Sequence, residues 1–116
     1  MRLKIDRCLV GLLGFLPLAV SANEALTFEQ GNQLMREKMC LGCHQVDKKR
    51  VGPAFVAIAN RYADDQQAAV PMLVNSIKQG GRGKWGAVPM PAQPQVSDEQ
   101  ANEMAIFILS LQQKPE

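Results

Sequence analysis

The sequence has few of the residues on which small folds and metal sites usually depend. It holds one histidine and three cysteines, and only 5% of its residues are aromatic. A structural zinc site needs four ligands, usually cysteine or histidine, and residues 23–116 offer only Cys40, Cys43 and His44. No segment alternates apolar and polar residues with the period of a β-strand. So few large side chains in a short chain predict a thin core that needs a staple.

The chain also lacks an excess of charge of either sign. Its formal net charge is +2, and from residue 23 onward basic and acidic residues are equal in number, ten of each. Nucleic-acid binding has no electrostatic support in such a balance, so no nucleic-acid partner is expected.

Residues 1–22 have the layout of a secretory signal peptide. Three basic residues come first, an apolar run from Cys8 to Val20 follows, and the small residues up to Ala22 suit a signal peptidase. The run is short for a bilayer span, and Pro17 interrupts it. We therefore expect cleavage near Ala22, which leaves one exported domain, residues 23–116, without stable membrane insertion. An uncleaved membrane anchor is the alternative.

Helical periodicity and capping signals predict an all-α fold of about four short helices. Thr27 and Ser97 each begin a capping-box pattern, with a glutamine three residues later. These patterns favour helices over about 28–39 and 97–112. The last helix should bury a stripe of residues at helical spacing: Ala101, Met104, Ala105, Ile108 and Leu111.

Two further helices are expected in the middle of the chain. One begins at Pro53, a residue suited to a first helical position, and continues to about Tyr62. The next carries Pro71 in its first turn and ends before Gly80 and Gly81. Its inward-facing residues are Met72, Leu73 and Ile77.

Residues 80–96 are expected to form a loop. Glycines fill its first half and prolines its second half, so the second half should be stiff. A loop of this length is unusual in a small domain, which suggests that it has a function.

Residues 40–44 read Cys-Leu-Gly-Cys-His, which is the haem-attachment pattern C-x-x-C-H. Two cysteines at this spacing lie about one helical turn apart, so both thiols can reach the vinyl groups on one edge of a porphyrin. The following histidine then lies under the ring and can bind the iron. A plain disulfide between Cys40 and Cys43 is the alternative, but it leaves His44 and the thin core unexplained. A covalent haem also supplies the missing staple.

The second iron ligand is chosen by elimination, because His44 is the only histidine. Met90 alone among the methionines lies on the stiff loop, between Pro89 and Pro91, where a restricted backbone can hold a thioether in place. Its alternative role is to cover the core. The other methionines lie on helical stripes or beside the first cysteine of the motif: Met35, Met39, Met72 and Met104.

Four further segments accompany the attachment motif in order along the chain. They are Val51-Gly52-Pro53-Ala54-Phe55, Ile77-Lys78-Gln79-Gly80, Lys84-Trp85-Gly86-Ala87-Val88-Pro89-Met90-Pro91 and Val96-Ser97-Asp98-Glu99. With these segments the chain resembles, from about residue 28 to residue 111, the small bacterial class I cytochromes c, especially the cytochrome c-551 (c8) type. The resemblance implies the class I cytochrome c fold around one covalent haem c. Cys40 and Cys43 would form the thioether bonds, and His44 and Met90 would be the axial ligands.

The resemblance implies two further contacts. The carbonyl oxygen of Pro53 would accept a hydrogen bond from the ligand histidine, and the indole N–H of Trp85 would bind a haem propionate. The alternative is that Trp85 only packs in the core and has no contact with a propionate. The chain departs from the family at Ser76, where some members have an arginine that binds a propionate. Arg82 and Lys84 are the candidates to replace that arginine.

The function that the resemblance implies is single-electron transfer and not enzymatic catalysis. The expected partners are transient redox proteins such as reductases, dehydrogenases and oxidases, which a monomer would meet in the periplasm. The alternatives are a dedicated electron-transfer subunit of a periplasmic oxidoreductase and an open-site haem protein that binds a ligand. Around the haem edge we expect an apolar ring and a basic rim: Leu41, Val88, Pro91 and Ala92 for the ring, and Lys48, Lys49, Arg50, Arg82 and Lys84 for the rim.

Overall fold

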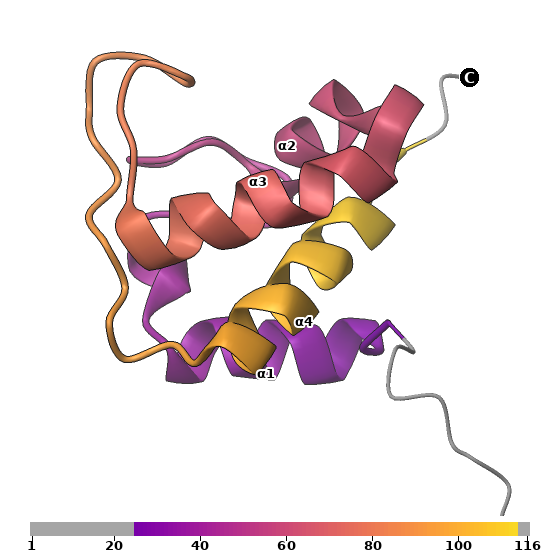
Figure 1. Cartoon of the computed structure of the whole chain (residues 1–116). Helices are drawn as coiled ribbons and strands as arrows, with labels where there is room; N and C mark the ends of the chain where they lie inside the picture. Colours follow the sequence, from indigo (N-terminus) through magenta and orange to yellow (C-terminus); the bar gives the residue numbers. More distant parts are fainter. Residues whose placement is uncertain (1–24, 114–116) are drawn as a thin grey trace, which may run out of the picture.

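A computed structural model describes residues 25–113, so the predicted signal peptide lies outside the described residues. The α-helices of this part are α1 (Phe28–Glu37), α2 (Phe55–Arg61), α3 (Gln66–Gln79) and α4 (Asp98–Ser110) (Figure 1). Short 3-10 turns lie at Cys40–Gly42 and Ala63–Asp65. Residues 25–113 contain no β-strand, only an isolated antiparallel bridge between Gly81 and Met90. The predicted all-α fold of about four short helices is confirmed.

Helix α4 lies at the centre of the fold and contacts α1, α2 and α3 (Figure 1). Both predicted capping boxes are present. The hydroxyl of Thr27 accepts a hydrogen bond from the backbone N–H of Gln30 at 3.3 Å, and the hydroxyl of Ser97 accepts one from Gln100 at 3.1 Å. Because both caps fix where a helix begins, α1 and α4 start where the sequence predicted.

Gly31 sets the close approach of α1 to α4. It is buried, and a Cβ at this position would overlap the ring of Phe107. The Phe107 ring is itself buried and lies 6.3 Å from the ring of Phe28, between centroids. The absence of a side chain at Gly31 therefore lets an aromatic ring of α4 rest on the backbone of α1.

Helix α2 begins at Phe55, and the prediction that it begins at Pro53 is wrong. The backbone of Ala54 is extended, with ψ 143°. The backbone N–H of Phe55 donates to the carbonyl oxygen of Gln45 at 2.9 Å, and the carbonyl oxygen of Pro53 accepts from His44 at 2.8 Å. The N–H of Phe55 and the carbonyl oxygen of Pro53 therefore join this segment to the attachment motif and to the residue that follows the motif.

Helix α3 begins at Gln66, earlier in the chain than the prediction of Pro71 in its first turn requires. Its N-terminus is capped by Asp65, whose carboxylate accepts from the backbone N–H of Ala68 at 3.0 Å. Pro71 therefore lies inside the helix and not in its first turn, so that prediction is wrong. A proline there leaves the carbonyl oxygen of Gln67 without its helical donor, and both residues are exposed, so water can replace the lost partner.

The inner face of α3 was predicted in part. Leu73 and Ile77 are buried as expected, but Met72 is 42% exposed, so its inward placement is wrong. Along α4 the predicted stripe is correct: Ala101, Met104, Ala105 and Ile108 are buried and Leu111 is half-buried. No helix within residues 25–113 is long and apolar enough to cross a bilayer.

Candidate haem-binding site

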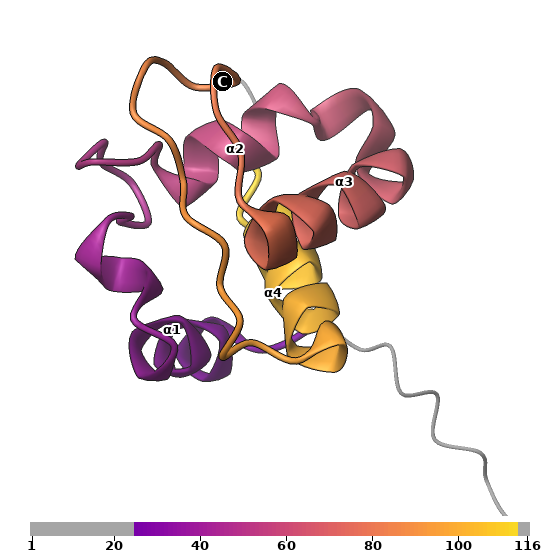
Figure 2. The same cartoon turned by 60° about the vertical axis from the view of Figure 1, so that its left-hand side comes forward.

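An apolar cavity lies between two segments that are far apart in the sequence. One is the histidine wall, residues 40–55, which follows α1, and the other is the methionine loop, residues 80–96, which follows α3. Both segments lie on the same side of the helices (Figures 1 and 2). Side chains of the core form the cavity floor: Met35, Phe55, Ile58, Leu73, Ile77, Met104 and Ile108. Every predicted cofactor-binding residue lines this cavity: Cys40, Cys43, His44, Pro53, Trp85 and Met90.

The attachment motif begins with a sharp turn at the end of α1. Met39 has φ 66° and ψ 13°, which makes it the only non-glycine residue with positive φ among residues 25–113. The 3-10 turn that follows brings the backbone N–H of His44 to the carbonyl oxygen of Cys40 at 3.0 Å. Both thiols are free; that of Cys43 is exposed and that of Cys40 is half-buried. Burial raises the pKa of the Cys40 thiol above its usual value.

His44 is buried, and its ring has a fixed orientation. Its Nδ1 lies 2.8 Å from the carbonyl oxygen of Pro53. A carbonyl oxygen can only accept, so Nδ1 carries the proton and Nε2 keeps its lone pair. Within the described residues no side-chain hydrogen bond reaches Nε2. This is the tautomer that a metal-binding histidine needs, with an acceptor that orients the ring.

The imidazole ring is held between a glycine and an aromatic ring. A Cβ at Gly52 would come within 2.8 Å of Nδ1 and 2.9 Å of Nε2 of His44. The ring also stacks on Phe55, with centroids 5.3 Å apart and an angle of 17° between the planes. Two free thiols and an oriented imidazole beside an apolar cavity are the donors that a covalent haem requires, so the residues present fit this group.

Met90 is anchored in the methionine loop by its own backbone. It exchanges two hydrogen bonds with Gly81, at 2.8 and 3.0 Å, and its side chain is half-buried against the core. Gly80, with φ 74°, allows the two halves of the loop to meet, because a Cβ there would overlap the carbonyl oxygen of Met90. Beyond Met90, the backbone N–H of Gln93 donates to the carbonyl oxygen of Ile77, a residue of α3, at 3.0 Å.

Trp85 and Lys84 belong to the same loop and line the same cavity. The ammonium group of Lys84 lies 3.4 Å from the hydroxyl oxygen of Ser76. Between the two candidates to replace the missing arginine, Lys84 is therefore the one that contacts position 76; Arg82 also lines the cavity but has no such contact.

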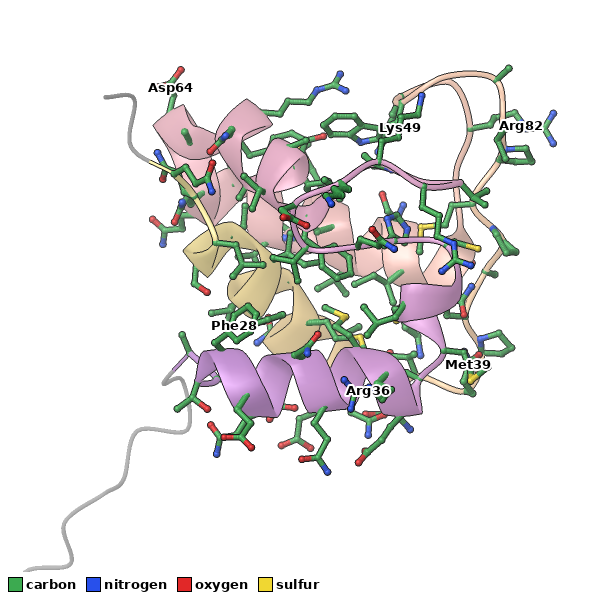
Figure 3. All side chains as sticks on the ribbon, turned by 180° about the vertical axis from the view of Figure 1, so that it is seen from behind. Phe28, Arg36, Met39, Lys49, Asp64 and Arg82 are labelled. Carbon is green, nitrogen blue, oxygen red and sulfur yellow. The ribbon has the colours of Figure 1, made fainter. Side chains whose placement is uncertain are left out.

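The predicted basic rim is gathered at the cavity only in part. Lys49, Arg82 and Lys84 line the cavity and are exposed. Lys49 and Arg82 lie on the same side of the molecule, away from Asp64 (Figure 3). Lys48 and Arg50 are exposed but do not line it. In the predicted apolar ring, Val88 and Pro91 line the cavity and are exposed, whereas Leu41 and Ala92 do not line it.

A family model described as cytochrome c matches residues 28–112. The chain belongs to the cytochrome c family. Cytochrome c-552 of Hydrogenobacter thermophilus is 43% identical over 97 residues, which cover 84% of this chain and 96% of that protein. Cytochrome c-551 of Pseudomonas denitrificans is 46% identical over 81 residues, which cover 70% of this chain and 96% of that protein. The crystal structure of Nitrosomonas europaea cytochrome c552 matches with a TM-score of 0.67 at 43% identity, over 70% of this chain and 99% of that chain.

This cytochrome c is therefore a small electron carrier with covalently bound haem c and the class I fold that the resemblance predicted. The sequence did not show that position 52 has no room for a side chain beside His44, although Gly52 lies in one of the segments that resemble the family. It gave no signal at all for Arg61, which reaches the methionine loop from the end of α2.

Proposed function

We propose that this cytochrome c binds its haem through thioether bonds to Cys40 and Cys43, with the iron held between Nε2 of His44 and the sulfur of Met90. It would then serve as a single-electron shuttle and not as an enzyme, because His44 and Met90 together would hold the iron and leave no ligand position for a substrate. The bound haem supplies a reversible one-electron couple of its iron.

The orientation of His44 is the observation that supports this assignment most strongly. Its Nδ1 is occupied by the carbonyl oxygen of Pro53, and the ring lines the same cavity as both thiols. Only Nε2 is then available for a metal, and a ring fixed by hydrogen bonding and stacking loses little entropy when it binds one.

Met90 is the counterpart of His44 in this proposal. A thioether ligand favours the reduced iron and raises the potential. The backbone pair between Met90 and Gly81, at 2.8 and 3.0 Å, fixes the backbone from which this side chain extends. The open-site alternative gains no support, because the same cavity contains this methionine. Trp85 lines the cavity, so its indole N–H can donate a hydrogen bond to a haem propionate.

Export and partner choice are part of the proposal. Residues 1–22 would direct the chain to the periplasm and be removed near Ala22, leaving residues 23–116 as a monomeric domain. Redox partners would meet it briefly at the cavity mouth, where Lys49, Arg82 and Lys84 favour an acidic partner surface.

Intact mass and carbon monoxide binding test the proposal. The full chain is made with a haem-attachment system in cells that have a periplasm. The expected product is residues 23–116 carrying one haem, with no carbon monoxide binding at neutral pH. Replacing either Cys40 or Cys43 by Ser should leave at most one thioether bond, which a changed reduced spectrum reports. A product without haem contradicts the attachment, and ready binding of carbon monoxide contradicts the His44/Met90 pair.

A further inference from the structure

The tip of the methionine loop, residues 82–89, has almost no hydrogen bonds of its own. Within residues 25–113 no backbone–backbone hydrogen bond involves any residue of the tip; the pair between Gly81 and Met90 only closes its base. Each residue of the tip nevertheless lines the cavity. Something other than regular backbone pairing must therefore hold this side of the cavity in place.

Arg61, at the end of α2, makes the contact that joins the tip to the helices. Its guanidinium N–H donates to the carbonyl oxygen of Lys84 at 2.6 Å. The same guanidinium carbon lies 4.6 Å from the centroid of the Trp85 ring. Among the residues that the structure describes, the only other hydrogen bond of the tip runs from the Lys84 ammonium to the hydroxyl of Ser76, and at 3.4 Å it is much longer.

We propose that Arg61 is a positioning residue that clamps the loop tip, and through it Trp85, against the cavity. A guanidinium can stack flat on an indole and donate a hydrogen bond in its own plane at the same time, whereas an ammonium group cannot do both. Arg61 does not line the cavity, so it acts only through Lys84 and Trp85. This inference rests on the proposed function, because the cavity that the tip closes is the haem cavity.

Release of the tip should admit water to the cavity. A more polar and more exposed cavity favours the charged, oxidised iron centre and lowers the reduction potential. Loss of the contact should also let the tip detach from the helices more often, and trypsin should then cleave faster after Arg82 and Lys84 of the tip.

The test compares Arg61→Ala, Arg61→Lys and Arg36→Ala in the haem-loaded protein. Arg36 is exposed on α1, away from Arg82 of the tip (Figure 3), and has no side-chain hydrogen bond or ion pair among the described residues, so it controls for loss of one arginine charge. The rate of trypsin cleavage after Arg82 and Lys84 is measured, with cleavage after Lys48 and Lys49 of the histidine wall as the internal reference. The reduction potential is measured on the same samples.

In Arg61→Ala trypsin should cleave the tip at least about fivefold faster than in the unaltered protein, from loss of a charged hydrogen bond and a cation–π contact. Cleavage in the histidine wall should not change, and the potential should fall by more than in Arg36→Ala. Arg61→Lys keeps the charge, and its tip should still be cleaved faster than in the unaltered protein. The inference is overturned if Arg61→Ala matches Arg36→Ala in both measurements, or if Arg61→Lys restores both, since charge alone would then explain the effect.

Failure of the proposed function gives a different pattern. If the unaltered protein attaches haem but shows no sign of methionine ligation, the role of Met90 is wrong. The cleavage rate of the tip in the variants still decides the role of Arg61, because it compares proteins that carry the same haem.

Discussion

The histidine wall and the methionine loop face the same cavity but are held in place by different means. Hydrogen bonds between near neighbours run through the histidine wall, including those from Gly52 N–H to Cys43 at 2.8 Å and from Phe55 N–H to Gln45 at 2.9 Å. The methionine loop is longer and is pinned mainly at its base, where Gly81 pairs with Met90, and at its far end. The histidine wall is thus a locally folded unit, whereas the methionine loop is attached to the helices at a few points.

The difference indicates how each of the two proposed iron ligands is held in place. His44 is oriented by residues within eleven positions of its own, so its geometry should survive changes elsewhere in the fold. The loop that carries Met90 is bonded to α3 through Gln93 and to α2 through Lys84, so changes in those helices should alter the position of the methionine. Four substitutions can break or sharpen this comparison, and they follow from the largest expected effect to the smallest.

Gly80→Ala should damage the methionine loop most. The new Cβ meets the carbonyl oxygen of Met90, and φ 74° with ψ −172° is a conformation that only glycine adopts readily. We expect a loss of about 3 kcal/mol in the free energy of unfolding, measured by denaturant titration. Gly81→Ala is the matched control, because no atom lies within 4 Å of its ideal Cβ. Equal stability of the two variants would contradict this role for Gly80.

Gly52→Ala should damage the histidine wall. Its Cβ would lie within 2.8 Å of Nδ1 of His44, so either the ring or the backbone must move. We expect a loss of about 2 kcal/mol in the free energy of unfolding, together with a changed spectrum of the bound haem. Gly42→Ala, at a position with open space around it, should change neither quantity. An unchanged spectrum in Gly52→Ala would show that the wall is less rigid than its hydrogen bonds suggest.

Lys78→Met should loosen the far end of the methionine loop. The Lys78 ammonium donates to the carbonyl oxygen of Val96 at 2.6 Å and lies 3.1 Å from a carboxylate oxygen of Asp98. Asp98 is exposed, so most of the expected loss, about 1.5 kcal/mol in the free energy of unfolding, comes from the hydrogen bond. Thermal unfolding would measure it, with the exposed Lys48→Met as control. If both variants melt together, the loop end does not depend on Lys78.

Met39→Gly should stabilise the protein slightly. Met39 is 75% exposed and has φ 66°, which a glycine adopts without steric strain. The gain in the free energy of unfolding should be about 0.5–1 kcal/mol, because the added freedom of glycine in the unfolded chain offsets part of the relief. The change lies beside the histidine wall and should leave the reduction potential unaltered. A destabilised variant would mean that the Met39 side chain makes contacts that outweigh the strain.

The sequence predicted those features that depend on local chemistry. Helix starts at Thr27 and Ser97 follow from capping boxes, and the end of α3 follows from Gly80, because each signal lies at the boundary it marks. The gathering of the predicted cofactor residues around one cavity also followed, through the attachment motif and the resemblance.

Features that depend on partners distant in the sequence were not predictable. Pro53 does not begin α2, because its carbonyl oxygen is used by His44. Met72 points outward although its neighbour Leu73 is buried, and a single apolar run does not fix that register. Arg61 contacts Lys84, which is 23 residues away, and no pattern in the sequence links them.

The ferric optical spectrum tests the central claim most directly. Iron ligated by a methionine sulfur gives a weak far-red charge-transfer band, so the haem-loaded protein should show this band and Met90→Ala should lose it. Met72→Ala, which removes an exposed methionine from α3, should keep the band. Loss of the band in Met90→Ala alone is the result that His44/Met90 ligation predicts. A band that persists in Met90→Ala, or that is absent from the unaltered protein, would contradict it.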